Sequence, residues 1–405
     1  MRIALVCDTM SAFGGAERVI KQILAVYPQA DVFSVLDIVP QGQRDFLKNR
    51  KVYTSFLQNM PLIEHYYRHL LHIWPLAVEQ LDVTGYDLVI SSHHSVAYGV
   101  LTRPGQTHIS YVHSPMRYAW DMQHQYLQQS RLNHGPFGLL ARQILHKVRI
   151  WDYAAAQRPD SIIANSGFVA ERLFRIHGRD ALVVHPPVDV ACRRQDRHGS
   201  GEDYYISVGR LVPYKRADLL VQAFARMPHR HLKIVGDGPD ARKLAAMAPR
   251  NVEILGFQPD AVVRQLLGNA RAYLFAGIED FGITPVEAQA AGTPVIAYGA
   301  GGLTESIIGL DQPDPTGLFF DEQSEGAVVA AVEAFEANAF RISPQACIAN
   351  AARFSEERFR SEFSGVVEEV LSSSQTARVR RKQKVLPWTP ISAETVPLRK
   401  PNPVS

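Results

Sequence analysis

Two glutamates, Glu279 and Glu287, stand eight positions apart on either side of a glycine-containing turn. An apolar run at residues 272–275 leads into this segment, and a helical pattern from Pro285 leads out of it. A strand that ends in a glycine turn and opens a helix gathers free backbone N–H groups and the positive end of a helix dipole, which suits an anion. The carboxylates cannot bind that anion and are suited to hydroxyl groups. The pattern predicts a ligand with anionic and polyhydroxylated parts, such as a nucleotide sugar.

A simpler interpretation of the two glutamates is also open. Glu279 would be a solvated loop residue, and Glu287 a carboxylate in the first turn of a helix, where the dipole favours it. This interpretation explains Glu287 and leaves Glu279 without a role.

A basic segment at residues 208–216 contains Arg210 and Lys215 and follows the first predicted strand of the second half. Arginine offers a planar fork and lysine a point charge, and together they suit a diphosphate. Such cations would stabilise a departing nucleoside diphosphate without a metal, so we expect neither a metal nor another cofactor. A surface loop with basic residues of no special role is the alternative.

Three further turns follow predicted strands. Gly14 and Gly15 precede a helix and permit a close backbone approach to a ligand, but they do not form the GxGxxG fingerprint of NAD-dependent enzymes. Gly236 lies in a GxG turn that could support the nucleotide or be a simple tight turn. The turn at residues 299–302 could close the nucleotide pocket or be a flexible loop.

His113 ends a predicted strand at residues 108–112 and is followed by several aromatic residues. At a strand end it could orient a sugar hydroxyl or contact the reacting centre, and a structural histidine is the alternative. His93 and His94 follow another predicted strand and could line the same cleft.

Short apolar runs alternate with longer amphipathic stretches, which predicts an α/β fold with parallel sheets. At 405 residues the chain is long enough for two domains of Rossmann size. The expected strands cover residues 3–7, 32–36, 88–91, 108–112, 161–164 and 182–185 in the first half, and 204–209, 232–235, 252–255, 272–275, 295–298 and 317–319 in the second.

A polar, basic segment from Cys192 to Asp203 interrupts this alternation and predicts the linker. We therefore expect a domain at residues 1–190, a second at 191–371, and a disordered tail at 372–405 with seven basic side chains and one acidic side chain in its last 30 residues. Three scattered cysteines form neither a disulfide framework nor a zinc site, which favours a reducing cytoplasm. No segment reaches the length of an apolar membrane span.

Taken together, these residues resemble the retaining glycosyltransferases of family 4, which have the GT-B fold. The resemblance covers nearly the whole chain from Gly14 to the segment at 354–359. It implies two doubly wound Rossmann-like domains facing a central cleft, with the acceptor on the N-terminal side and a final helix that can pack back on that domain. Arg210 and Lys215 match the family's diphosphate pair, and Gly14, Gly15 and Gly236 are expected to help bind the donor.

The resemblance also implies roles for the acidic motif. Glu279 would contact the donor sugar and Glu287 the ribose, while N–H groups around Phe281, Gly282 and Ile283 would serve the sugar and phosphate. His113 falls where the family has a histidine near the transferred sugar. We expect Glu279, His113, Arg210 and Lys215 to form the catalytic set.

The segment at residues 113–121 is similar to bacterial mannosyltransferases that use GDP-mannose to build exopolysaccharide or O-antigen units on polyprenyl diphosphate. A UDP-sugar donor with a different acceptor, and a catalytically silent sugar-nucleotide-binding protein, are the alternatives. A nucleic-acid partner has only the basic tail to support it.

Apolar and basic residues recur at helical spacing over residues 139–151, near an aromatic and basic stretch at 66–70. This pattern could be an interfacial helix that holds a cytoplasmic protein on the anionic inner face of the membrane. A helix that packs on the core and turns a basic face to solvent is the alternative.

Overall fold

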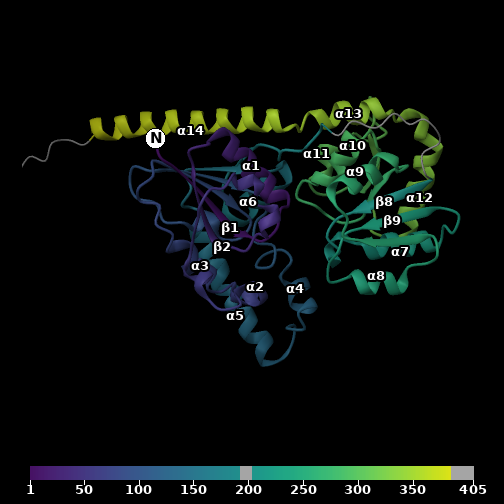
Figure 1. The fold of residues 1–405 in the computed structure, drawn as a ribbon, viewed down its shortest axis with the longest axis horizontal. Helices are drawn as coiled ribbons and strands as arrows, with labels where there is room; N and C mark the ends of the chain where they lie inside the picture. Colours follow the sequence, from purple (N-terminus) through teal and green to yellow (C-terminus); the bar gives the residue numbers. More distant parts are fainter. Residues whose placement is uncertain (192–202, 385–405) are drawn as a thin grey trace, which may run out of the picture.

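The computed structural model describes residues 1–191 and 203–384, which form two α/β domains (Figure 1). The first is built on a parallel sheet with strand order β3-β2-β1-β4-β5-β6-β7. Its strands are β1 (Ile3–Met10), β2 (Asp31–Asp37), β3 (Val52–Thr54), β4 (Leu88–His93), β5 (Thr107–Val112), β6 (Ser161–Ala164) and β7 (Leu182–Val183).

The central strands β1, β4 and β5 are buried along their whole length, because helices cover both faces of the sheet. This explains why they are near-continuous apolar runs instead of alternating patterns. The α-helices of this domain are α1 (Gly15–Val26), α2 (Ile63–Tyr66), α3 (Trp74–Glu79), α4 (Gln123–Gln129), α5 (Gly135–Ala155) and α6 (Gly167–His177).

The second domain has a parallel sheet with strand order β10-β9-β8-β11-β12-β13. Its strands are β8 (Tyr204–Val208), β9 (His231–Val235), β10 (Val252–Gly256), β11 (Tyr273–Phe275), β12 (Val295–Tyr298) and β13 (Gly317–Phe320). Its α-helices are α7 (Ala217–Ala225), α8 (Ala241–Met247), α9 (Asp260–Asn269), α10 (Ile283–Ala290), α11 (Leu303–Ser306), α12 (Glu325–Asn338) and α13 (Pro344–Ala352).

The last helix, α14 (Glu356–Lys384), leaves the second domain and runs along the first (Figure 1). Phe359, Phe363 and Val367 are fully buried in the core formed by β1 and α1. At the crossing, the N–H of Val188 donates to the carbonyl of Phe354 at 2.9 Å. Helix α14 therefore packs against the first domain, although it follows the second domain in the sequence.

The prediction of two doubly wound α/β domains is confirmed, and each expected strand has a counterpart. Strand β3 was not predicted, because its three residues lie at the sheet edge and are only partly buried. The prediction of a tail disordered from residue 372 is wrong as far as residue 384, since helix α14 extends that far. The serine run that suggested the tail contains neither proline nor glycine and so does not end the helix. The expected linker lies almost wholly outside the described residues.

Replacing Phe363 with alanine should lower the free energy of unfolding of the first domain by about 3–5 kcal/mol, because it leaves a cavity under α14. Urea unfolding followed by tryptophan fluorescence measures this, since Trp74, Trp120 and Trp151 lie in that domain. Phe340→Ala is the matched control, because Phe340 is 86% exposed and its loss should change stability by less than about 0.5 kcal/mol. Equal effects of the two substitutions would contradict the packing of α14.

Candidate active site between the two domains

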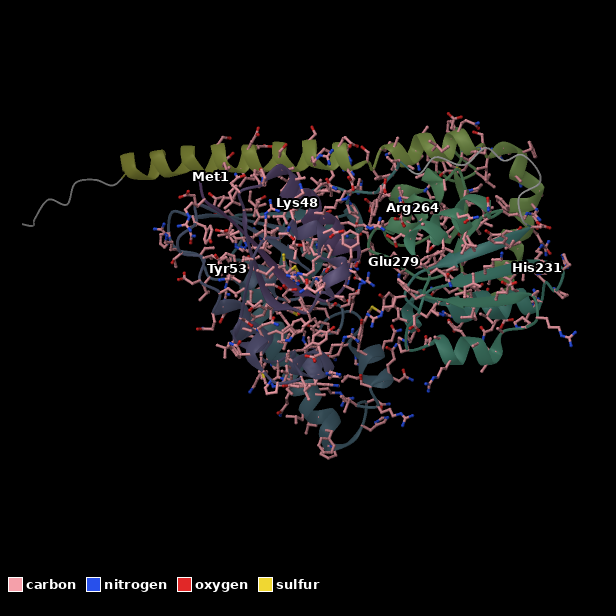
Figure 2. All side chains as sticks on the ribbon, in the orientation of Figure 1. Met1, Lys48, Tyr53, His231, Arg264 and Glu279 are labelled. Carbon is pink, nitrogen blue, oxygen red and sulfur yellow. The ribbon has the colours of Figure 1, made fainter. Side chains whose placement is uncertain are left out.

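Each sheet reverses its strand order beside its first strand, between β1 and β4 in the first domain and between β8 and β11 in the second. Ligands of open α/β sheets bind beyond the carboxyl ends of the strands at such points. A cavity of about 270 Å³ lies there, with residues of both domains in its wall. Figure 2 places Glu279 where the two domains face each other. The wall comprises Gly15, Ala16, His113, Asn165, Pro186, Val208, Lys215, Tyr273, Phe275, Glu279, Asp280, Phe281, Gly282, Ile283, Thr284 and Pro285.

The acidic motif forms the turn that joins β11 to α10. Gly282 caps the helix with φ of 87°, a conformation that favours glycine, and α10 begins at the next residue. The turn is braced from behind, where the N–H of Gly302 donates to the carbonyl of Glu279 at 2.9 Å. A Cβ on Gly302 would lie 2.1 Å from the carbonyl oxygen of Asp280, so only glycine permits this contact.

Lys215 and Glu279 form an ion pair in the cavity wall, with Nζ 2.8 Å from Oε1. Their side chains are only 22% and 20% exposed. Burial favours the neutral amine, but the charge of Glu279, its hydrogen bond and the nearby Tyr214 together outweigh burial and raise the pKa of Lys215. The structure thus places a fully charged cation beside the carboxylate that the sequence predicts to bind a sugar.

Glu287 pairs across the cleft with Arg18 of α1, at 2.5 Å. The interpretation of Glu287 as a first-turn carboxylate is wrong, because α10 begins at Ile283 and has no acidic residue in its first turn. The glutamate instead lies one turn into the helix, where it meets the other domain.

His113 lies in the cavity wall on the first-domain side. Its Nε2 is 2.8 Å from the hydroxyl of Ser92, and Asn165 donates to its carbonyl at 2.8 Å. Burial lowers the pKa of His113 to about 3, so the ring is neutral at physiological pH. It can exchange hydrogen bonds with a sugar but cannot supply a positive charge.

The other two histidines that the sequence singled out differ from each other. His93 is fully buried and stacks on Tyr98, and burial lowers its pKa to about 3, as expected of a core residue. The side chain of His94 is 43% exposed, and its Nδ1 is 3.1 Å from the carboxylate of Asp8. Neither residue belongs to the cavity wall.

The predicted glycines take different positions. A Cβ on Gly15 would lie 3.1 Å from Ile283 Cδ1, so the turn before α1 closely approaches the start of α10 across the cleft. Gly14 caps α1 and donates its N–H to Glu17 at 3.0 Å. Gly236 is outside the cavity wall, and a Cβ there would lie 1.9 Å from the carbonyl oxygen of Gly209, so packing between two loops requires a glycine.

Two other predicted donor-binding residues offer little or none of their side chains to the cavity. Arg210 is exposed and lies outside the cavity wall. It is close enough to Tyr126 of α4 for its positive charge to oppose the rise in the pKa of that phenol that burial causes. Phe281 contributes to the wall, but the residue is only 2% exposed and packs with Val188 and Phe354 where the chain crosses between domains.

Sequence reasoning missed the contacts that join the domains beside the site. Asp280 pairs with Arg117, and it also pairs with Arg172 of α6 at 2.7 Å. Glu305 accepts the N–H groups of Gly167 and Phe168 at the start of α6, both at 2.9 Å. The acidic residue next to Glu279 was a visible signal, but its partners depend on how two separately folded domains meet.

Residues 191–354 match the family described as "Glycosyl transferases group 1", and residues 13–191 match "Glycosyltransferase Family 4". The two matches together span well over half of the chain. Each of the two domains therefore matches a family of glycosyltransferases.

Several curated relatives of this chain are described as "D-inositol 3-phosphate glycosyltransferase". That of Mycobacterium sp. (strain KMS) is 30% identical over 222 residues, which are 48% of this chain and 49% of the relative. That of Geodermatophilus obscurus is 31% identical over 258 residues, 54% of this chain and 55% of the relative. The chain thus matches about half the length of these relatives.

Solved structures show the same GT-B fold over most of this chain. The lipopolysaccharide outer core galactosyltransferase WaaB has a TM-score of 0.62 at 20% identity, covering 91% of this chain and 99% of its own. Anabaena HepE in complex with UDP-glucose has a TM-score of 0.64 at 18% identity, covering 91% and 100%. Sucrose-phosphate synthase from Thermosynechococcus elongatus has a TM-score of 0.68 at 16% identity, covering 92% and 100%.

Replacing Glu279 with glutamine should lower kcat/KM for sugar transfer by at least about a hundredfold, because it removes the charge that faces Lys215 and that we predict to bind the donor sugar. Steady-state transfer assays on purified protein measure this. Glu336→Gln is the control, because Glu336 pairs with Arg230 in the same domain outside the cavity wall. A Glu279→Gln protein that melts like the wild type and keeps its turnover would refute the assigned role.

Proposed function

We propose that this protein is a retaining glycosyltransferase that moves a sugar from a nucleotide donor to a glycan acceptor. The observation that carries the proposal is the Lys215–Glu279 pair in one cavity with the start of α10. A cation and free helix N–H groups suit a diphosphate, and a carboxylate suits sugar hydroxyls. A catalytically silent binder would have no need for this combination.

In the proposed reaction the acceptor hydroxyl attacks the sugar on the face from which the diphosphate leaves. The bond between C1 and the phosphate oxygen breaks, a bond from C1 to the acceptor oxygen forms, and the acceptor proton passes to the departing phosphate. We assign this route because Glu279 and Asp280, the carboxylates in the described cavity wall, are both held in ion pairs. Lys215 and the start of α10 would stabilise the negative charge that develops on the diphosphate.

We favour GDP-mannose as the donor on the similarity of residues 113–121 to bacterial mannosyltransferases. His113 of that segment reaches the cavity, which supports a role beside the transferred sugar. A UDP-sugar is the second candidate, since the HepE neighbour was solved with UDP and with UDP-glucose. With GDP-mannose as the donor, the acceptor that we propose is a polyprenyl-diphosphate-linked glycan.

A thermal-shift screen of GDP- and UDP-sugars, followed by transfer assays, should find GDP-mannose to raise the Tm most, because a ligand stabilises the state that binds it. Transfer of radiolabelled mannose to a lipid-linked acceptor should then follow. Binding without turnover would favour a silent sugar-nucleotide-binding protein. Transfer from UDP-sugars with no response to GDP-mannose would refute the mannosyl donor and keep the enzyme class.

We further propose that the first domain contacts an anionic membrane through α4 and α5, at the end of the molecule farthest from α14 (Figure 1). Three apolar side chains near the start of α5 are exposed, Phe137 at 74%, Leu139 at 61% and Leu140 at 53%. Residues 122–151 contain four Lys and Arg residues and no Asp or Glu. Exposed apolar side chains with basic and no acidic residues around them suit the interface of an anionic bilayer. No helix of the described residues is long and apolar enough to cross a membrane.

Vesicles that contain phosphatidylglycerol should sediment the protein, and pure phosphatidylcholine vesicles should sediment much less. Replacing Phe137 and Leu140 with serine should weaken the partitioning by at least about tenfold, because it removes two apolar side chains from the interface. Phe257→Ser is the matched control, since Phe257 is 75% exposed in the second domain. Equal losses in both proteins, or binding that ignores lipid charge, would contradict the proposed surface.

A further inference from the structure

Arg117 is a first-domain residue whose side chain reaches the second domain beside the active site. Its guanidinium forms an ion pair with Asp280, and its Cζ lies 5.3 Å from the ring centroid of Tyr214. Its Nε donates to the hydroxyl of Ser114 at 3.2 Å, which fixes the plane of the fork. The side chain is only 14% exposed, so solvent screens these contacts weakly.

The two residues that Arg117 touches are the chain neighbours of the active-site ion pair. Asp280 follows Glu279, and Tyr214 precedes Lys215. One side chain of the first domain therefore contacts both loops that carry the pair.

These two loops pack too closely to shift independently. A Cβ on Gly277 would lie 2.6 Å from the carbonyl oxygen of Tyr214 and 2.7 Å from Cα of Lys215. The backbone of the acidic turn thus packs directly against the backbone that carries Lys215. A displacement of one loop therefore displaces the other.

We propose that Arg117 is a positioning residue that makes the alignment of Lys215 and Glu279 depend on the approach of the two domains. The inference rests on the proposed glycosyl transfer and assigns part of its control to the acceptor-side domain. With the domains together, Arg117 holds both loops; with the domains apart, Asp280 and Tyr214 lose that partner. The pair would then be aligned when the cleft is closed to water, which favours the acceptor hydroxyl over water as the attacking group.

Arg172 provides a matched comparison within the same cluster. It binds the other oxygen of Asp280 and also pairs with Asp121 of its own domain, each at 2.7 Å. Its guanidinium lies over Phe168 at the start of the same helix, 5.6 Å from the ring centroid. Loss of either arginine removes one ion pair across the domains, but Arg117 also contacts the lysine loop.

The test compares Arg117→Gln with Arg172→Gln, using the donor that the wild type turns over. For Arg117→Gln we expect kcat for transfer to fall by about a hundredfold, the size of effect that a small misplacement of catalytic groups produces. The share of donor lost to hydrolysis should rise, while the Kd for the nucleoside diphosphate should change less than about threefold, because Arg117 is outside the cavity wall. Arg172→Gln should lower kcat by less than about fivefold at a similar loss in Tm.

Two further variants separate positioning from charge and from interface strength. Arg117→Lys should recover only part of kcat, because lysine keeps the charge but not the planar fork that meets both Asp280 and Tyr214. Tyr214→Leu should raise the hydrolysed share of the donor, as Arg117→Gln does. The fold-loss of kcat in the double variant should be smaller than the product of the two single fold-losses, because both substitutions break the same contact.

Equal losses of kcat in Arg117→Gln and Arg172→Gln, with the hydrolysed share unchanged, would show that Arg117 only strengthens the interface. That result would overturn the positioning role and leave the proposed function standing. A wild-type protein that transfers sugar from no nucleotide donor would overturn the proposed function, and this inference with it.

Discussion

The carboxylate of Asp280 lies between Arg117 and Arg172 of the other domain, and this ion-pair cluster fixes where the acidic turn can stand. The hydroxyl of Ser166, also in the first domain, donates to the carbonyl of Asp280 at 2.5 Å. The three charged side chains are only 11–14% exposed, and breaking such a pair leaves a poorly solvated charge, at a cost of about 3–5 kcal/mol when burial is complete. The donor-side turn is therefore held by a domain to which it does not belong.

The second domain makes this arrangement possible by bringing backbone against backbone behind the cleft. A side chain on Gly236, Gly238 or Gly302 would place its Cβ 1.9–2.3 Å from a carbonyl oxygen of a neighbouring loop. Such contacts exclude every residue with a Cβ, so the loops behind the cleft pack against one another directly. Rigid loops would matter in the proposed reaction, because electrostatic stabilisation by Lys215 and Glu279 requires that the two side chains be aligned before the reaction begins.

Local patterns were enough to predict the strands and much of the site. A buried parallel strand is a near-continuous apolar run, and its carboxyl end faces the cleft, so Glu279, Lys215 and His113 could be located from sequence. The domain-joining contacts of Arg117 and Glu305 could not, because a side chain in one domain meets the other only through their relative placement. Arg210 and Gly236 also follow strand ends but lie outside the described cavity wall, so their predicted roles in donor binding stay predictions.

The charged side chains of the site form ion pairs, and this affects how the proposed diphosphate could bind there. Lys215 and Arg18 would be costly to hold charged in a partly buried cleft, and Glu279 and Glu287 offset that cost. In the proposed reaction a diphosphate would approach Lys215 beside Glu279, which would keep one carboxylate oxygen on the lysine and offer the other to a sugar hydroxyl. The raised pKa of Lys215 ensures that the amine is already protonated before a diphosphate arrives. The same two ion pairs can thus stabilise the cleft and prepare it for a donor.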